Sequence, residues 1–142
     1  MGKEIKTRIQ IHAPVNKVWG VLSNFSDYKT WNPFITSISG DMQVGSQIEA
    51  QIEPPEAKSM TFKPTVLVCY ENKEFRWLGS AGLKGIFDGE HYFLLEELNG
   101  VTMFTHGEKF SGLLIPFMGK MLEKTKRGFE KMNEALKSKC EE

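Results

Sequence analysis

The segment FTHGEKF, residues 104–110, sets a histidine two positions before a glutamate within a run of strand-forming residues. Successive side chains in a strand alternate between two faces, so Phe104, His106, Glu108 and Phe110 share one face. Two aromatic rings therefore bracket an imidazole and a carboxylate. At neutral pH such a pair is suited to acid–base chemistry, to metal ligation, or to hydrogen bonding with the polar end of a ligand.

A second histidine is expected on the neighbouring strand. Residues 86–98 and 101–110 flank an Asn-Gly pair, which is a strong turn signal for a β-hairpin. His91 and Phe93 share one face of the first of these strands. When both inner faces point into the protein, two histidines and one carboxylate enter an apolar space. They then need partners, because burial of unpaired polar groups costs several kcal/mol.

Three functions remain open for His106 and Glu108, with His91 as a third candidate. These residues could form a structural pair in a cavity wall, bind the polar head of an apolar ligand, or catalyse a reaction as an acid–base pair. A metal site is weakly supported, because His-x-Glu on one strand with a remote histidine is not a zinc signature. We therefore expect neither a metal nor a cofactor.

The sequence lacks the motifs of several enzyme classes. It contains no Gly-x-Ser-x-Gly segment of an activated serine, and no cysteine stands beside a plausible base. The glycine-rich segment at residues 79–85 fits neither the dinucleotide-binding pattern nor the phosphate-binding loop. Nucleophilic catalysis and nucleotide binding are therefore not expected.

Length and charge restrict the class of protein. We expect one domain over residues 1–142, because this is an ordinary domain length. Lys and Arg number 18, as do Asp and Glu, so the formal net charge is zero and nothing favours a nucleic-acid partner. No stretch approaches the ~20 apolar residues of a membrane span, and the N-terminus lacks a signal-peptide core. These features predict a cytoplasmic protein without a transmembrane segment, as a monomer or weak dimer.

Alternation and helical periodicity together predict an α+β fold. A strand over residues 4–12 precedes two short helical segments, at 14–22 and 24–28. Six further strands are expected at residues 34–39, 47–53, 60–70, 74–79, 86–98 and 101–110, with Pro64 at an edge position or a bulge. An apolar stripe predicts a helix over residues 115–139. The expected architecture is a curved antiparallel sheet of about seven strands wrapped around this long C-terminal helix.

This order of elements and four local patterns resemble the SRPBCC superfamily, which has the START-like helix-grip fold. The patterns are IQIHAPVNKVWGVLSNFSDYKTWNPFI at residues 9–35, FRWLG at 75–79, FDGEHYFLLEEL at 87–98 and THGEKFSGLL at 105–114. With the order of elements, the resemblance extends over essentially the whole chain, and it is to polyketide cyclase/dehydratase-like and lipid-transport-like members. The resemblance implies a deep apolar cavity between the sheet and the last helix.

The candidate lining of that cavity is rich in aromatic residues and methionine, which is typical of pockets for small apolar ligands. A volume of roughly several hundred Å³ is expected. Gly128, within the last helix, is expected either to permit close packing or to act as a flexible gate. The candidate ligand-binding residues are Trp31, Phe34, Phe62, Trp77, His91, Phe93, Phe104, His106, Glu108, Phe110, Phe117, Met118 and Met121.

These observations favour a protein that binds or transports a small hydrophobic ligand, such as a lipid, a polyketide-like aromatic or an isoprenoid. One alternative is an enzyme of the cyclase or dehydratase type, in which His106, with Glu108 or His91, moves protons. Confinement and positioning would then supply most of the catalysis. A second alternative is an interaction protein related to chaperone activators, whose long helix presents an apolar patch.

Overall fold

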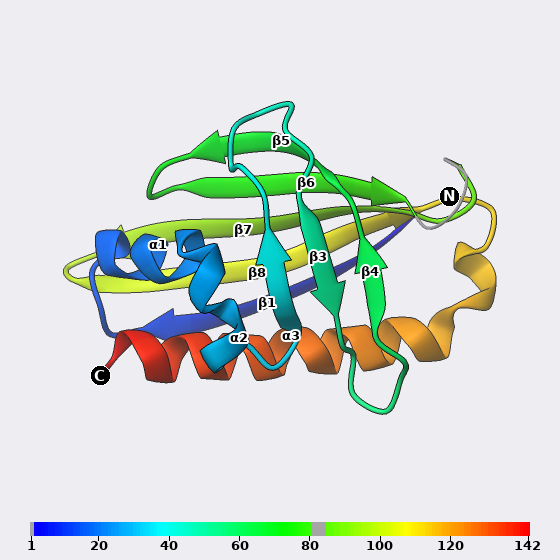
Figure 1. Ribbon diagram of the computed structural model, residues 1–142. Coiled ribbons are helices and arrows are strands. Elements are labelled where there is room, and N and C mark those ends of the chain that lie inside the picture. Colours follow the sequence, from blue (N-terminus) through cyan, green and yellow to red (C-terminus); the bar gives the residue numbers. More distant parts are fainter. Residues whose placement is uncertain (1, 81–84) are drawn as a thin grey trace.

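The computed structural model describes residues 2–80 and 85–142 and consists of two antiparallel sheets and one long helix (Figure 1). The larger sheet has the strand order β1-β8-β7-β6-β5. Its strands are β1 (Lys3–Ile11), β5 (Thr65–Tyr70), β6 (Glu74–Ser80), β7 (Asp88–Leu98) and β8 (Val101–Ser111). The smaller sheet has the order β2-β3-β4, with β2 (Ile35–Ser39), β3 (Glu49–Ile52) and β4 (Met60–Phe62). In Figure 1 these three strands cross in front of the larger sheet.

The helix-grip architecture that the sequence predicts is confirmed, with one change in its strands. The single strand predicted over residues 60–70 is divided, because β4 ends at Phe62 and β5 begins at Thr65. Pro64 lies between them, and proline has no N–H to donate to a sheet. The two pieces belong to different sheets, so the described residues contain eight strands where about seven were expected.

The helices follow the predicted order. After β1 come α1 (Val15–Ser23), the 3₁₀ turn η1 (Phe25–Asp27) and α2 (Tyr28–Trp31). After β8 come the 3₁₀ turn η2 (Ile115–Phe117) and α3 (Gly119–Cys140), which runs along the lower edge of both sheets in Figure 1. The buried side chains of α3 recur at helical spacing, so this helix presents one apolar stripe to the sheets. No described helix is long and apolar enough to cross a membrane.

The β7–β8 hairpin keeps a regular register along its whole length. Its pairs include His91 with Glu108 and Phe93 with His106. A β-bulge at Gly107 would have turned His106 and Glu108 apart, but the pairing passes through Gly107 without a shift. Glycine is required there because the Tyr92 ring lies over it, where any Cβ atom would overlap the ring. The histidine and the glutamate therefore share the inner face of the sheet.

The two ends of this architecture differ. At one end, α1 and α2 pack against the sheet and against the C-terminal half of α3, and Tyr28, Phe75 and Leu136 are fully buried there. Tyr28 Oη donates a hydrogen bond to the carbonyl oxygen of Leu22 at 2.6 Å, which satisfies the buried hydroxyl. At the other end, a cavity lies between the two sheets and the N-terminal half of α3.

Candidate functional site

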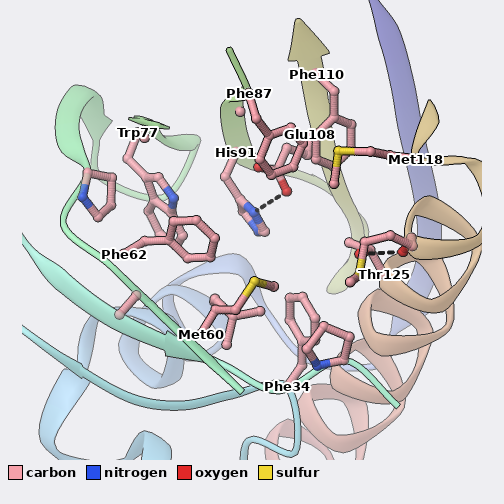
Figure 2. Close-up of a pocket in the computed structure, with 17 residues that line it drawn as sticks. Phe34, Met60, Phe62, Trp77, Phe87, His91, Glu108, Phe110, Met118 and Thr125 are labelled. Atoms are coloured by element: carbon pink, nitrogen blue, oxygen red, sulfur yellow. Dashed lines mark hydrogen bonds and ion pairs between the residues drawn. The ribbon is translucent and has the colours of Figure 1, made fainter. Parts of the chain in front are cut away.

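A cavity of about 80 Å³ lies between the two sheets and the N-terminal half of α3 (Figure 2). Most of its lining is apolar. The lining residues are Phe34, Ala50, Ile52, Pro54, Met60, Phe62, Pro64, Trp77, Gly79, Phe87, Gly89, His91, Glu108, Phe110, Met118, Met121 and Thr125. Figure 2 shows Trp77 and His91 on one side, Met118 and Thr125 on the other, and Phe34 and Met60 below.

Inward-facing glycines create space on the sheet side of the cavity. Gly79 and Gly89 are register partners on β6 and β7, and Gly89 is also paired with Phe110 on β8. Any side chain at Gly89 would overlap the carboxyl group of Glu108, so that group occupies the place where a β7 side chain would stand. The glycines therefore allow Glu108 to lie flat against the cavity wall.

The cavity is smaller than the volume expected from the sequence. Pockets for drug-sized ligands commonly measure about 300–1,000 Å³, whereas this one measures about 80 Å³. Three methionines, Met60, Met118 and Met121, form part of the wall. Methionine side chains are unbranched and have three rotatable bonds, so they can change the shape of the wall without a movement of the backbone.

A chain of hydrogen bonds leads from the cavity into the core. Glu108 Oε1 lies 3.2 Å from His91 Nδ1, and His91 Nε2 lies 2.8 Å from His106 Nε2. His106 Nδ1 lies 2.9 Å from Asn133 Oδ1 on α3. Asn133 Nδ2 donates to Thr7 Oγ1 at 2.8 Å, and this hydroxyl donates to the backbone carbonyl oxygen of His106 at 2.8 Å. Five side chains from four elements thus form one continuous chain.

The far end of this chain favours one direction for all of its hydrogen bonds. A carbonyl oxygen can only accept a hydrogen bond, so the Thr7 hydroxyl donates its single proton to the carbonyl oxygen of His106. The Thr7 oxygen then accepts from the Asn133 amide. Asn133 Oδ1 then accepts from His106 Nδ1–H, which leaves His106 Nε2 as an acceptor. His91 must donate from Nε2, so its Nδ1 also accepts. The remaining donor is Glu108, which must carry a proton on Oε1.

The opposite direction is less favourable. An ionised Glu108 would accept from His91, and the Asn133 amide would have to turn over. Thr7 would then donate to Asn133 Oδ1, and the carbonyl oxygen of His106 would lose its hydrogen bond from that hydroxyl. One hydrogen bond would be lost, and a negative charge would face an apolar cavity, where its solvation is poor. The neutral form of Glu108 is therefore the one that this chain stabilises.

The electrostatic environment also favours the neutral forms of Glu108, His91 and His106. Burial raises the pKa of Glu108 to about 8 and lowers the pKa of His91 to about 3. Burial, and then the proximity of His91, holds the pKa of His106 well below its ordinary value. Each of these shifts disfavours the charged form of its group, in agreement with a hydrogen-bonded chain of neutral side chains.

Aromatic rings hold the two imidazoles in place. Trp77 stacks on His91 with ring centroids 4.7 Å apart and an interplanar angle of 14°. Phe129 stacks on His106 at 4.0 Å and 10°. These contacts fix the ring planes, and with them the direction in which each nitrogen points. His91 reaches the cavity wall, whereas His106 is fully buried behind it.

The structure brings together eight of the thirteen predicted site residues and separates the other five. The eight on the cavity wall are Phe34, Phe62, Trp77, His91, Glu108, Phe110, Met118 and Met121. Phe93, Phe104 and His106 do face inward but are packed in the core behind the wall. Trp31 packs against that core from the side of α2, and Phe117, predicted to line the cavity, is 84% exposed on η2. His106 and Glu108 are also not in contact, since His91 stands between them.

Several residues of the site were not predicted from the sequence. The cavity wall also contains Ala50, Ile52, Pro54, Met60, Pro64, Gly79, Phe87, Gly89 and Thr125. Most of these are small or come from the second sheet, whose position over the first is not visible in a local pattern. Thr7 and Asn133 complete the hydrogen-bonded chain. Thr7 could have been noticed, because it is the one buried polar residue of β1 and lies between Ile5 and Ile9 on the inner face.

Two comparisons relate the chain to known proteins. The family described as polyketide cyclase / dehydrase and lipid transport matches residues 3–141. Among solved structures, the Zhui aromatase/cyclase from Streptomyces sp. R1128 superposes with a TM-score of 0.80, at 12% identity, over 99% of this chain and 94% of that one. A START superfamily protein from Mycobacterium smegmatis superposes with a TM-score of 0.76, at 20% identity, over 97% of both chains.

A third solved structure, Ara h 8.0201, has a TM-score of 0.72 at 13% identity, over 99% of this chain and 98% of that chain. No curated protein matches the chain significantly in sequence. At these identities the structural similarities show a shared fold. This chain therefore shares its fold with an aromatase/cyclase and with a START superfamily protein, and its cavity lies between the sheets and the C-terminal helix of that fold.

Proposed function

This chain belongs to the polyketide cyclase/dehydrase and lipid transport family, and we propose that it binds a small hydrophobic ligand in the cavity between its sheets and α3. One observation carries the proposal: an apolar cavity whose wall contains a single neutral carboxyl–imidazole pair, Glu108 and His91. Apolar walls with a few placed polar groups are typical of ligand sites. Burial of the ligand would contribute about 25 cal/mol per Å² of apolar surface.

The methionine side chains in the cavity wall determine how large a ligand the cavity can hold. At about 80 Å³ the cavity holds little more than a small ring, so a larger ligand requires side chains to move. Met118 immediately precedes α3, Met121 lies in its first turn, and Met60 lies on β4 in the opposite part of the wall. Rotation of these three side chains would enlarge the cavity while the hydrogen-bonded wall stays fixed.

A cyclase- or dehydrase-type activity is the second candidate, and the presence of a protonated carboxyl group on the cavity wall favours it. Such an activity would use Glu108 as the group that touches the substrate. His106, which the sequence suggested for this role, lies behind the wall and contacts Glu108 only through His91. His106 would then be a positioning residue. The chaperone-activator-like function stays a prediction that no contact in the described residues tests.

Binding can be tested with ethylbenzene, an apolar molecule of about the right size, by isothermal titration calorimetry. We expect saturable binding to the wild-type protein. Met121→Asp, which sets a charge on the wall, should abolish binding. Phe117→Asp is the matched control, because it introduces the same charged residue at an exposed site four residues away and should leave affinity unchanged. Equal effects of both substitutions, or no binding to the wild type, would contradict the proposal.

A further inference from the structure

The hydrogen-bonded chain leaves one atom of Glu108 without a partner. Oε1 is engaged with His91, whereas Oε2 accepts no hydrogen bond within the described part of the chain. Oε2 lies over Gly89, which is itself part of the cavity wall. The Glu108 side chain retains 17% of its exposure, and the cavity is the space that it adjoins. An oxygen atom is thus available to a molecule in the cavity.

The chemical character of that oxygen follows from the direction of the chain. The one carboxyl proton sits on Oε1 and is donated to His91 Nδ1, which has no other donor. Oε2 is therefore the carbonyl oxygen of a neutral acid, and a carbonyl oxygen only accepts hydrogen bonds. A ligand can pair with it only by donating one.

We infer that the cavity selects ligands that carry a hydroxyl group, an alcohol or a phenol, which donates a hydrogen bond to Glu108 Oε2. This inference rests on the proposed function and specifies its ligand class. The hydroxyl would complete the chain at its open end, just as the carbonyl oxygen of His106 completes it at the closed end. The chain of donors would then run unbroken from ligand to backbone.

A ligand with a carbonyl group in the same place has no such partner. Two acceptor oxygens would face each other across the cavity. To donate to the ligand, Glu108 would have to withdraw its proton from His91, and His91 Nδ1 would be left buried without a donor. An unsatisfied buried acceptor is unfavourable. Among the described lining residues, His91 has both ring nitrogens engaged in the chain, and Thr125 donates its hydroxyl proton to the carbonyl oxygen of Met121, so neither replaces Glu108 as a donor. The site therefore discriminates against ketones of the same shape.

Three molecules of one shape separate these effects: 1-phenylethanol, acetophenone and ethylbenzene. The first donates a hydrogen bond, the second only accepts, and the third does neither. We expect calorimetric titration of the wild-type protein to give about tenfold tighter binding of the alcohol than of the ketone, the ratio that one well-made hydrogen bond supplies. A ratio of one or below would overturn the inference.

Two substitutions locate the source of the preference. Glu108→Leu removes the acceptor and should bring the alcohol-to-ketone ratio to about one, while binding of ethylbenzene persists and shows that the fold and cavity are intact. Glu108→Gln should keep the preference, because its N–H replaces the acid proton at His91 and its carbonyl oxygen replaces Oε2. A preference that survives Glu108→Leu, or that is lost in Glu108→Gln, would overturn the inference.

The proposed binding function and the inferred role of Glu108 can be disproved separately. If ethylbenzene binds and the alcohol has no advantage over the ketone, the binding function stands and the role of Glu108 is wrong. If none of the three molecules binds to the wild-type protein, the proposed function is wrong, and the ligand class falls with it.

Discussion

The two halves of α3 differ in their packing: one is buried against the rest of the protein, and the other borders the cavity. The C-terminal half packs against α1 and the larger sheet, and Phe129, Met132 and Leu136 have no exposed surface. The N-terminal half borders the cavity through Met121 and Thr125, next to Met118 just before the helix, and the preceding turn leaves Phe117 exposed to solvent. One half therefore supplies most of the packing that stabilises the fold, while the other leaves a volume that side chains do not fill. Stability and binding are located at different ends of one helix.

A polar chain joins the two ends. It begins at Thr7 and Asn133 in the packed half and ends at Glu108 on the cavity wall. A change in the packed half can thus alter the protonation of a group that faces the cavity. The difference between the halves is testable by substitutions that act on only one of them.

The largest effect is expected from Phe129→Ala in the packed half. This ring is fully buried and contacts both His106 and Phe34, so its loss leaves a cavity and should lower the free energy of unfolding by about 3–5 kcal/mol. Met121→Ala, at an equally apolar position beside the existing cavity, should cost about 1 kcal/mol or less. Chemical denaturation of both variants measures the difference, and equal losses would show that α3 is not divided in this way.

A smaller change in the free energy of unfolding is expected from pH, because Glu108, His91 and His106 in the polar chain can titrate. Glu108 has a pKa raised to about 8 in the folded state, so its stabilisation is complete below its ordinary pKa of 4.5 and is lost as pH rises toward 8. His91, with a pKa lowered to about 3, and His106, whose pKa is also lowered, act oppositely. Their stabilisation is complete above pH 6.5 and is lost as pH falls.

Above pH 6.5 the carboxyl group is thus the one member of the chain that still titrates. The free energy of unfolding should fall by about 2 kcal/mol between pH 6.5 and pH 8 on account of Glu108 alone. Glu108→Gln cannot ionise and should lack this decline, so the difference between the two denaturation series isolates it. Parallel pH profiles for the two proteins would mean that the wild-type carboxyl group is already ionised at pH 6.5.

The smallest effect concerns the boundary between the halves, at Gly128. The Phe34 ring lies against this glycine, so a methyl group would overlap it. The resulting strain of about 1–3 kcal/mol should exceed the gain of about 1 kcal/mol in helix propensity, and Gly128→Ala should therefore be mildly destabilising. Gly20→Ala in α1 is the control. Nothing lies within 4 Å of its new methyl group, so this variant should be more stable than wild type.

Thermal denaturation distinguishes the two glycine variants. Stabilisation of Gly128→Ala to the extent seen for Gly20→Ala would contradict the close contact with Phe34. It would favour the other function expected for Gly128 from the sequence, a flexible gate in the helix.

The sequence predicts the fold more fully than the site, and particular residues show why. Phe104 and Phe110 determine the buried face of β8, so the inward direction of His106 and Glu108 follows from alternation alone. The two-residue turn at Asn99 and Gly100 also fixes the hairpin register, and counting back from it pairs His91 with Glu108. The sequence therefore contains enough information to predict the His91–Glu108 contact, whereas the shared face of the strand by itself suggested a pair of His106 with Glu108.

Other parts of the site depend on tertiary placement. Asn133 contacts His106 only because α3 lies at one particular height and rotation over the sheet, and no local pattern specifies either. The separation of β4 from β5 at Pro64 was expected only as a bulge or an edge, yet it builds the second sheet and one wall of the cavity. The small volume of the cavity is set by how far methionine side chains reach inward, which composition does not determine.

The protonation of Glu108 is the point on which the account of this site depends most, and NMR can measure it directly. A titration of the side-chain carboxyl carbon of Glu108, assigned by its absence in Glu108→Gln, gives the pKa of this group in the folded protein. We expect a pKa of about 8, so that the carboxyl group is neutral at pH 7 and donates to His91. A pKa near the ordinary value of 4.5 would show an ionised group at neutral pH, and would contradict both the direction of the hydrogen-bonded chain and the ligand selectivity inferred from it.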